Sequence, residues 1–208
     1  PLHTALALSG CLLGFGLICD EMKDKDLKKM VEILGYKEGL PVVVDPKIIK
    51  PKTFIDEVIE KRLPNPFMPD TPQRIATDTS QKLSIRFGET VKAYLANPEL
   101  DVKTLKILPM VFALWLRYLL GIDDNGKEFE LSPDPLLPDV KNELAGIVIG
   151  KNDEFEVEEK IKKLLKNEKI FGFDVVSSEL YGKVKSYFME MISANGKVRE
   201  VISRAVEN

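Results

Sequence analysis

The chain has 208 residues, of which 44% are hydrophobic and 30% are charged, and its formal net charge is −3. This apolar fraction excludes a disordered chain, and the near balance of 30 basic and 33 acidic residues argues against nucleic acid or an anionic membrane as the main partner. At about 150 residues per domain, the length fits one domain or two small ones.

Residues 2–18 form an apolar run directly after Pro1. No basic residue precedes the run and no small-residue cleavage pattern follows it, which argues against a signal peptide. Three glycines and several polar residues interrupt it, so a membrane span is also disfavoured. We expect a buried helix followed by a turn. Because chains rarely begin inside a core segment, we also expect this chain to be a fragment of a longer protein.

The glycines and cysteines in and beside this run indicate how it packs. Gly10 and Gly14 are spaced for close helix packing, and Cys11 and Cys19 are expected to be buried free thiols. With one histidine and no Cys/His cluster, the chain is not expected to bind a metal. It also lacks the glycine-rich patterns that bind nucleotide phosphates, so no cofactor-binding residue is predicted.

The next segments alternate between helical periodicity and proline. Residues 26–34 predict a helix with Gly35 as its C-cap. Residues 40–51 contain three prolines and predict an extended connector, and residues 54–63 predict a short helix with Phe54, Val58 and Ile59 on one face.

Four further prolines exclude a regular element over residues 63–70. A long helix is then predicted from residue 71 to about 95, with Asp70 as its N-cap and Gln73 at the capping-box position.

The remaining sequence is also helical. Residues 108–121 are apolar on all sides and predict the central buried helix, with Pro109 at its first position and Trp115 and Tyr118 in the core. A turn at 123–126 and a proline-rich loop precede a helix near 140–149. The last 70 residues have no proline and predict amphipathic helices. The predicted fold class is mainly α.

Two groups of residues are candidates for chemistry. His3 is the only histidine; it is either a helix-start residue satisfied by backbone or water, or a proton-handling group in a cleft. Arg74, Asp78 and Lys82 have helical spacing along one face. They are either surface ion pairs worth about a few tenths of a kcal/mol each, or two cations suited to a polyhydroxy or carboxylate substrate.

The stretch 62–82, RLPNPFMPDTPQRIATDTSQK, resembles the C-terminal domain of the mannitol dehydrogenase family, the long-chain polyol and hexuronate dehydrogenases. The resemblance rests on the Asn65-Pro66 pair, Asp70, Arg74 and Lys82 at their spacing. The start PLHTALALSGCLLGFG is similar to the segment that follows the family's Lys-x4-Asn-x2-His signature, and LWLRYLLGID is similar to a later segment. The match covers most of the chain and is closest to the fructuronate reductase (D-mannonate oxidoreductase) branch.

The resemblance implies a fold and a site. Residues 1–208 would be the multi-helical C-terminal substrate domain of a two-domain dehydrogenase, with the Rossmann domain absent from this chain. His3 falls at the motif histidine that binds and orients the reacting oxygen, and is the catalytic candidate. Arg74 and Lys82 match substrate-binding positions. The family's general-base lysine and its oxyanion-binding asparagine would lie upstream of Pro1. The resemblance therefore implies Asn immediately before Pro1 and Lys five residues before that Asn.

The resemblance also implies an activity. The full-length protein would be a cytoplasmic, NAD- or NADP-dependent secondary-alcohol dehydrogenase that interconverts a keto sugar acid and its alcohol, with fructuronate and mannonate favoured. Its partners would be a small-molecule sugar acid or polyol and the absent N-terminal Rossmann domain, which would bind most of the cofactor, with no nucleic acid or membrane partner. This chain alone would be inactive. The alternatives are a mannitol or other polyol dehydrogenase and, in a different class, a non-catalytic helical interaction module.

Overall fold

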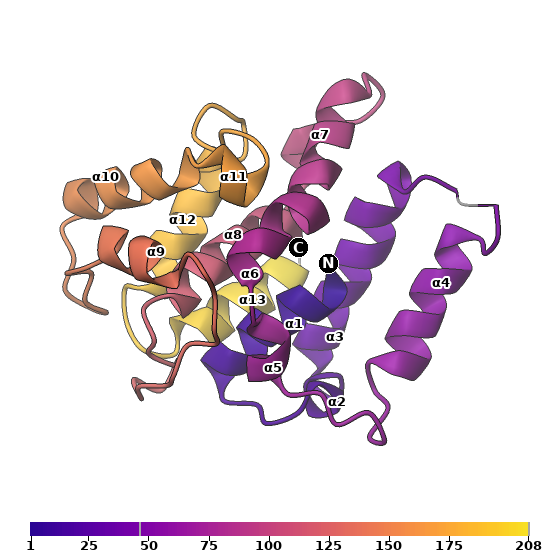
Figure 1. Ribbon diagram of the computed structural model, residues 1–208, viewed down its shortest axis with the longest axis horizontal. Helices are drawn as coiled ribbons and strands as arrows, with labels where there is room; N and C mark the ends of the chain where they lie inside the picture. The colour runs from indigo at the N-terminus through magenta and orange to yellow at the C-terminus, as the bar shows by residue number, and fades with distance from the viewer. Residues whose placement is uncertain (46, 208) are drawn as a thin grey trace.

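The computed structural model describes residues 1–45 and 47–207 (Figure 1). Within those residues the regular secondary structure is helical, and β-structure is limited to two isolated bridges, Ile122–Glu128 and Val148–Lys151. The predicted mainly α fold is confirmed. None of the described helices has the length and hydropathy that crossing a membrane would require.

The longest connection between helices runs from the end of α8 at Tyr118 to the start of α9 at Leu137. The α-helices are α1 (Leu2–Leu13), α2 (Ile18–Glu21), α3 (Lys25–Glu32), α4 (Pro51–Glu57), α5 (Pro72–Ala76), α6 (Thr79–Leu83), α7 (Glu89–Ala96), α8 (Ile107–Tyr118), α9 (Leu137–Glu143), α10 (Glu154–Leu165), α11 (Glu168–Phe171), α12 (Tyr181–Met191) and α13 (Lys197–Glu207). The π-helical and 3-10 segments are η1 (Ile33–Gly39), η2 (Leu40–Val42), η3 (Val58–Arg62), η4 (Ser84–Gly88) and η5 (Val102–Thr104).

Helix α8 is the centre of the core, as its all-round apolar sequence predicts. Every residue of α8 is buried, Trp115 and Tyr118 among them, and the helix packs against α12, α1 and α13 (Figure 1). The expectation that Pro109 takes the first helical position was wrong, because α8 begins two residues earlier, at Ile107. The carboxylate of Glu38 accepts from the backbone N–H groups of Lys106, Ile107 and Leu108 and so starts the helix from a distant part of the chain.

Arg117 is a charged residue inside this otherwise apolar helix. Its side chain is wholly buried, and its guanidinium donates to the backbone carbonyls of Ile122 at 2.5 Å, Asp123 at 3.1 Å and Met191 at 3.4 Å. Burial lowers its pKa to about 10. Arg117 therefore ties the loop after α8 to the end of α12.

Close packing of α1 depends on Gly10. A Cβ atom at this position would lie 2.3 Å from Oε1 of Glu21 and 2.7 Å from Cγ of Pro72, so only glycine lets α2 and α5 approach α1 this closely. Gly14 has a different role: it adopts a left-handed conformation and caps the end of α1. Cys11 and Cys19 are buried and free, as predicted, and burial raises the pKa of the Cys11 thiol to about 12.

The predicted C-cap at Gly35 was wrong. Asp24 caps the start of α3, accepting from the backbone N–H groups of Asp26 and Leu27, and the helix runs on into the π-helical segment η1. Gly35 lies inside η1, where a Cβ atom would lie 3.1 Å from Cγ2 of Ile55. The glycine is thus used for packing against α4, which lies at one edge of the molecule (Figure 1), and not for ending a helix.

The predicted face of the helix over residues 54–63 was wrong in part. After the connector, which contains the short turn η2, α4 starts at Pro51 and continues into η3. Val58 and Ile59 are buried, but the side of the helix that carries Phe54 is open, and Phe54 is 47% exposed.

The single helix predicted over residues 71–95 was also wrong. The chain breaks after α5: Thr77 is extended and Asp78 takes a left-handed conformation with φ of 55°. A distant loop replaces the missing helical bonds, because the backbone N–H of Asp78 donates to the carbonyl of Pro133, and the Asp134 carboxylate accepts from the N–H and hydroxyl of Ser80. Helices α6, η4 and α7 then follow with a new direction.

Two further boundaries differ from the prediction. Thr71, not Asp70, is the N-cap of α5, accepting from the backbone N–H of Arg74 at 3.2 Å. The helix expected near 140–149 is α9, which ends at Glu143. The amphipathic stripes predicted for the last third of the chain are confirmed by the buried faces of α10, α12 and α13.

Candidate functional site

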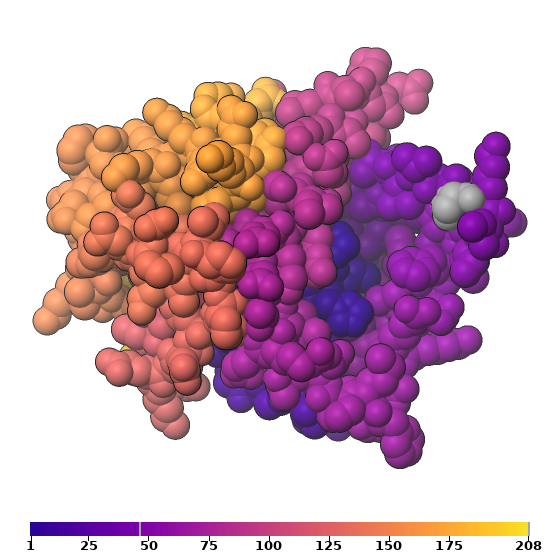
Figure 2. Space-filling model, in the orientation of Figure 1, coloured from indigo at the N-terminus to yellow at the C-terminus, as the bar shows by residue number. Residues whose placement is uncertain are grey.

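A cavity of about 930 Å³ lies between the start of α1, the segment 34–62 and the segment 74–90. Figure 2 shows it as a hollow, with the N-terminal residues at its floor between those two segments. Its lining comprises Pro1, Leu2, His3, Leu34, Gly35, Gly39, Val43, Val44, Ile48, Ile49, Pro51, Phe54, Ile55, Val58, Arg62, Arg74, Ile75, Lys82, Arg86, Phe87, Thr90 and Leu108. All three site residues predicted from the sequence are in this set.

The lining combines apolar side chains with basic ones. The basic residues are His3, Arg62, Arg74, Lys82 and Arg86, and no aspartate or glutamate is among the described residues that line the cavity. A concave site with apolar walls and a few converging polar groups is the usual form of a small-molecule site. The excess of cations suits a ligand that carries hydroxyl groups and negative charge.

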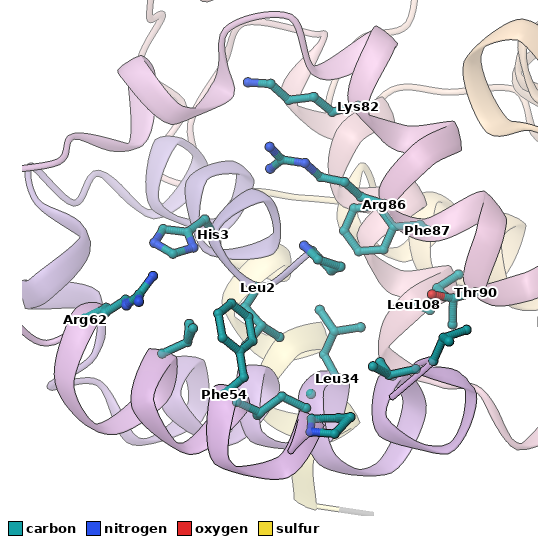
Figure 3. Close-up of a pocket in the computed structure, with 18 of the residues that line it drawn as sticks. Leu2, His3, Leu34, Phe54, Arg62, Lys82, Arg86, Phe87, Thr90 and Leu108 are labelled. Carbon is teal, nitrogen blue, oxygen red and sulfur yellow. The ribbon is translucent and has the colours of Figure 1, made fainter. Parts of the chain in front are cut away.

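His3 lies on the first turn of α1 and is half-buried at the floor of the cavity (Figure 3). Its pKa is lowered from the usual value, first by burial and also by the positive charges of Arg86 and Arg62. The imidazole is therefore neutral at pH 7, when one ring nitrogen donates a hydrogen bond and the other accepts one.

Lys82 is held by the break between α5 and α6. Its ammonium donates to the carbonyls of Ile75, at 3.2 Å, and Thr77, which the interrupted helix leaves free. Its pKa is lowered by burial and by the nearby charge of Arg86. Two of its three N–H donors are thus used to fix its position, and one remains for a ligand.

Arg74 lies at the mouth of the cavity, where its guanidinium pairs with the Asp70 carboxylate. Its side chain is 65% exposed. Because of the break at Thr77, the predicted alignment of Arg74, Asp78 and Lys82 on one helix face was wrong. The fold nevertheless brings Arg74 and Lys82 to the same cavity as His3.

Two of the cavity cations were not predicted as site residues from the sequence. Arg62, at the end of η3, reaches toward His3 from the opposite side (Figure 3), donates to Glu57 at 3.0 Å and lies 5.7 Å from the centre of the Phe54 ring. Arg86, in η4, donates to the hydroxyl of Thr4 at 2.6 Å. Its place one helical turn after Lys82 was a signal that could have identified it.

No metal centre is formed by the described residues: none of their His, Cys, Asp and Glu side chains gather in groups of three or more that could hold an ion. The described helices also have no glycine-rich turn of the kind that holds a dinucleotide pyrophosphate. What the residues described above supply is a cationic and apolar cavity.

Comparison with known proteins shows the family of the chain. The profile of the mannitol dehydrogenase C-terminal domain matches residues 2–192. D-mannonate oxidoreductase of Thermotoga maritima is 51% identical over 206 residues, which are 99% of this chain and 38% of that protein. Mannitol 2-dehydrogenase of Neosartorya fischeri is 28% identical over 194 residues, 93% of this chain and 36% of that protein.

The fold is also shared with a solved structure. Mannitol 2-dehydrogenase of Pseudomonas fluorescens, solved as a ternary complex with NAD and D-mannitol, superposes on the whole of this chain and on 39% of its own with a TM-score of 0.83, at 20% identity. The chain thus spans well under half the length of the relatives that it matches. It belongs to the family of mannitol dehydrogenase C-terminal domains.

Proposed function

We propose that residues 1–208 are the substrate domain of a longer NAD(P)-dependent secondary-alcohol dehydrogenase that interconverts a keto sugar acid and its alcohol, fructuronate and mannonate being the favoured pair. The observation that carries the proposal is the cavity lining, in which the described residues include five basic side chains and no carboxylate. The 51% identity with a D-mannonate oxidoreductase supports the same substrate class.

In this proposal His3 binds the reacting oxygen. A neutral imidazole donates a hydrogen bond to a carbonyl or hydroxyl oxygen without forming an ion pair, and half-burial of His3 shields that bond from water. NAD(P), held mainly by an N-terminal domain, would supply the hydride-transfer chemistry. The general base and the oxyanion-binding asparagine would lie upstream of Pro1.

Lys82 and Arg74 would align the open sugar chain. Lys82 is fixed by two backbone carbonyls and has a donor left for a hydroxyl group. Arg74 at the mouth would close over the ligand, exchanging its exposed pairing with Asp70 for substrate contacts. Holding the chain at these points keeps the reacting carbon in one position, which is how orientation accelerates a bimolecular reaction.

A substrate screen with the full-length enzyme tests the proposal. We expect kcat/KM to be highest for fructuronate among fructuronate, tagaturonate, fructose and the corresponding phosphates. Lys82→Ala and Arg74→Ala should lower kcat/KM by about tenfold or more, whereas Lys92→Ala, which removes an exposed cation of α7 outside the cavity, should not. A preference for fructose would favour the alternative function, a polyol dehydrogenase. Unchanged kinetics in both cavity variants would mean that Arg74 and Lys82 form only surface ion pairs and do not bind substrate.

The gene itself tests whether the domain is part of an enzyme. Asn should precede Pro1 immediately, with Lys five residues before that Asn, and a Rossmann domain should lie upstream. A start codon at this point would instead support the helical interaction module. As a second check, the isolated chain should neither turn over substrate nor bind NADH measurably by calorimetry.

A further inference from the structure

The cations of the cavity differ in how they are neutralised. Arg62 pairs with Glu57 and Arg74 with Asp70. Lys82 forms no ion pair within the described residues, but two backbone carbonyls accept from its ammonium, and the negative charges of Asp78 and Asp134 act on it. Arg86 also has no carboxylate within ion-pairing distance in the part of the chain that the structure describes, and it lacks such acidic neighbours. The one effect on its pKa is a lowering by burial, with no opposing acidic neighbour. Arg86 is therefore a partly buried positive charge without a counterion.

The orientation of Arg86 is set by a hydrogen bond to α1, behind the lining of the cavity. Nη1 of Arg86 donates to Oγ1 of Thr4 at 2.6 Å, and Thr4 is wholly buried in α1. The guanidinium extends into the cavity between Lys82 and His3 (Figure 3). One hydrogen bond to a buried acceptor thus holds the planar group in place and leaves its other N–H donors facing the ligand space.

A half-buried guanidinium without a counterion favours an anionic ligand. Burying an unpaired charge costs free energy, and a carboxylate that enters the cavity offsets this cost. Guanidinium matches a carboxylate in shape as well, since two parallel N–H donors meet two oxygens. Lys82 offers one remaining donor and Arg74 is already paired, so these two suit hydroxyl groups better.

We infer that Arg86 binds the carboxylate of the substrate, that Thr4 is the positioning residue that aims it, and that this pair determines the preference for sugar acids over polyols. The inference rests on the proposed function, since it names the specificity-determining contact of that same site.

The test compares an acid with a neutral ketose on the full-length enzyme. Arg86→Gln should lower kcat/KM for fructuronate by on the order of 100-fold, while kcat/KM for fructose changes by less than about 3-fold. Arg86→Lys, which keeps the charge but loses the planar fork, should lie between the wild type and Arg86→Gln for fructuronate. Lys92→Gln, a matched loss of one cation outside the cavity, should change neither substrate's kinetics.

Thr4 is tested through the split between KM and kcat. Thr4→Val keeps the shape of the side chain and removes the acceptor, so it should raise KM for fructuronate with kcat nearly unchanged and with the fructose kinetics unaffected. Thr4→Ser restores the hydroxyl and should restore KM. Equal loss with both substrates, or no loss with either, would overturn the positioning role.

The outcomes separate this inference from the proposed function. If the wild-type enzyme reduces fructuronate but Arg86→Gln affects acid and ketose alike, or neither, the role of Arg86 is wrong and the proposed function stands. If the wild type turns over no sugar acid, both are wrong. If circular dichroism shows that Arg86→Gln does not fold, the test uses Arg86→Lys in its place. Full activity of Arg86→Lys with fructuronate would overturn the proposed contact between the guanidinium of Arg86 and the substrate carboxylate.

Discussion

The carboxylate of Glu38 accepts the backbone N–H of Ile107 at 2.8 Å, across 69 residues of sequence. The same carboxylate accepts from Lys106 at 2.7 Å and from Leu108 at 2.8 Å, so one side chain satisfies three free amides at the start of α8. Gly39 and Leu108, which adjoin this contact, both line the cavity. The contact therefore joins one side of the site to the central helix.

Replacing this carboxylate should destabilise the whole domain. Glu38→Gln keeps the size but puts an NH₂ group against backbone N–H donors, so at least one buried amide loses its acceptor. We expect the free energy of unfolding to fall by about 1–3 kcal/mol, measured by urea denaturation of the full-length protein. Glu99→Gln, at an exposed position, is the matched control and should change stability by less than about 0.5 kcal/mol. Equal stabilities of the two variants would contradict the capping role.

A methyl group at Gly10 should separate three helices. In Gly10→Ala the new Cβ would lie 2.3 Å from Glu21 Oε1 and 2.7 Å from Pro72 Cγ, so α2 and α5 must move away from α1. We expect a loss of about 1–3 kcal/mol or more in stability, and weaker substrate use because α5 carries Arg74. Gly182→Ala, with open space around it in α12, should be neutral or stabilising by about 0.5–1 kcal/mol. A fully stable Gly10→Ala protein would show that the helices tolerate separation.

These contacts show why the sequence predicts some elements and not others. The all-apolar surface of α8 and the apolar stripes of α10, α12 and α13 follow from the order of neighbouring residues in the sequence. Hydrophobic periodicity is therefore enough to predict them. The start of α8 cannot be predicted in this way, since its cap is the carboxylate of Glu38, 69 residues away from Ile107 in the sequence. Glycine is the residue type that most often ends a helix, but the close packing of Gly35 against Ile55 overrides this local preference.

The candidate site also has some residues that the sequence predicts and others that only the fold reveals. His3, Arg74 and Lys82 are recognisable by their spacing within a family motif, and all three line one cavity. Their assumed alignment on a single helix was wrong, because Pro133 and Asp134 hold the break at residues 77–80 from a distant loop. Arg86 becomes conspicuous only when the fold shows that its guanidinium has Thr4 and no carboxylate beside it.

The backbone conformation of Asp78, at the break between α5 and α6, can be tested by substitution. Asp78 has φ of 55°, a left-handed conformation that strongly disfavours β-branched side chains. Asp78→Val should lower stability by about 1–3 kcal/mol, and should impair substrate use because the Thr77 carbonyl that holds Lys82 moves. Asp78→Gly, which adopts this conformation without strain, should be tolerated. Thermal denaturation of both variants checks the ordering, and equal melting temperatures would contradict it.

Glu21 is the remaining unusual group of the fold. It is wholly buried between α1 and α5, and within the described residues neither of its side-chain oxygens has a hydrogen-bond partner. Burial, assisted by the negative charge of Asp24, raises its pKa to about 9. The carboxyl group is therefore protonated, and neutral, at pH 7.

This shift makes stability depend on pH. The folded state keeps the Glu21 proton up to about pH 9, whereas the unfolded chain loses it near its ordinary pKa of 4.5. The stabilising contribution is thus complete below pH 4.5 and is lost progressively as the pH rises toward 9, by on the order of 1 kcal/mol per pH unit. Glu21→Gln cannot ionise, so its stability relative to the wild type should rise steadily from pH 5 to pH 8.5 in urea denaturation. A pH-independent difference for Glu21→Gln would mean that Glu21 is ionised in the fold.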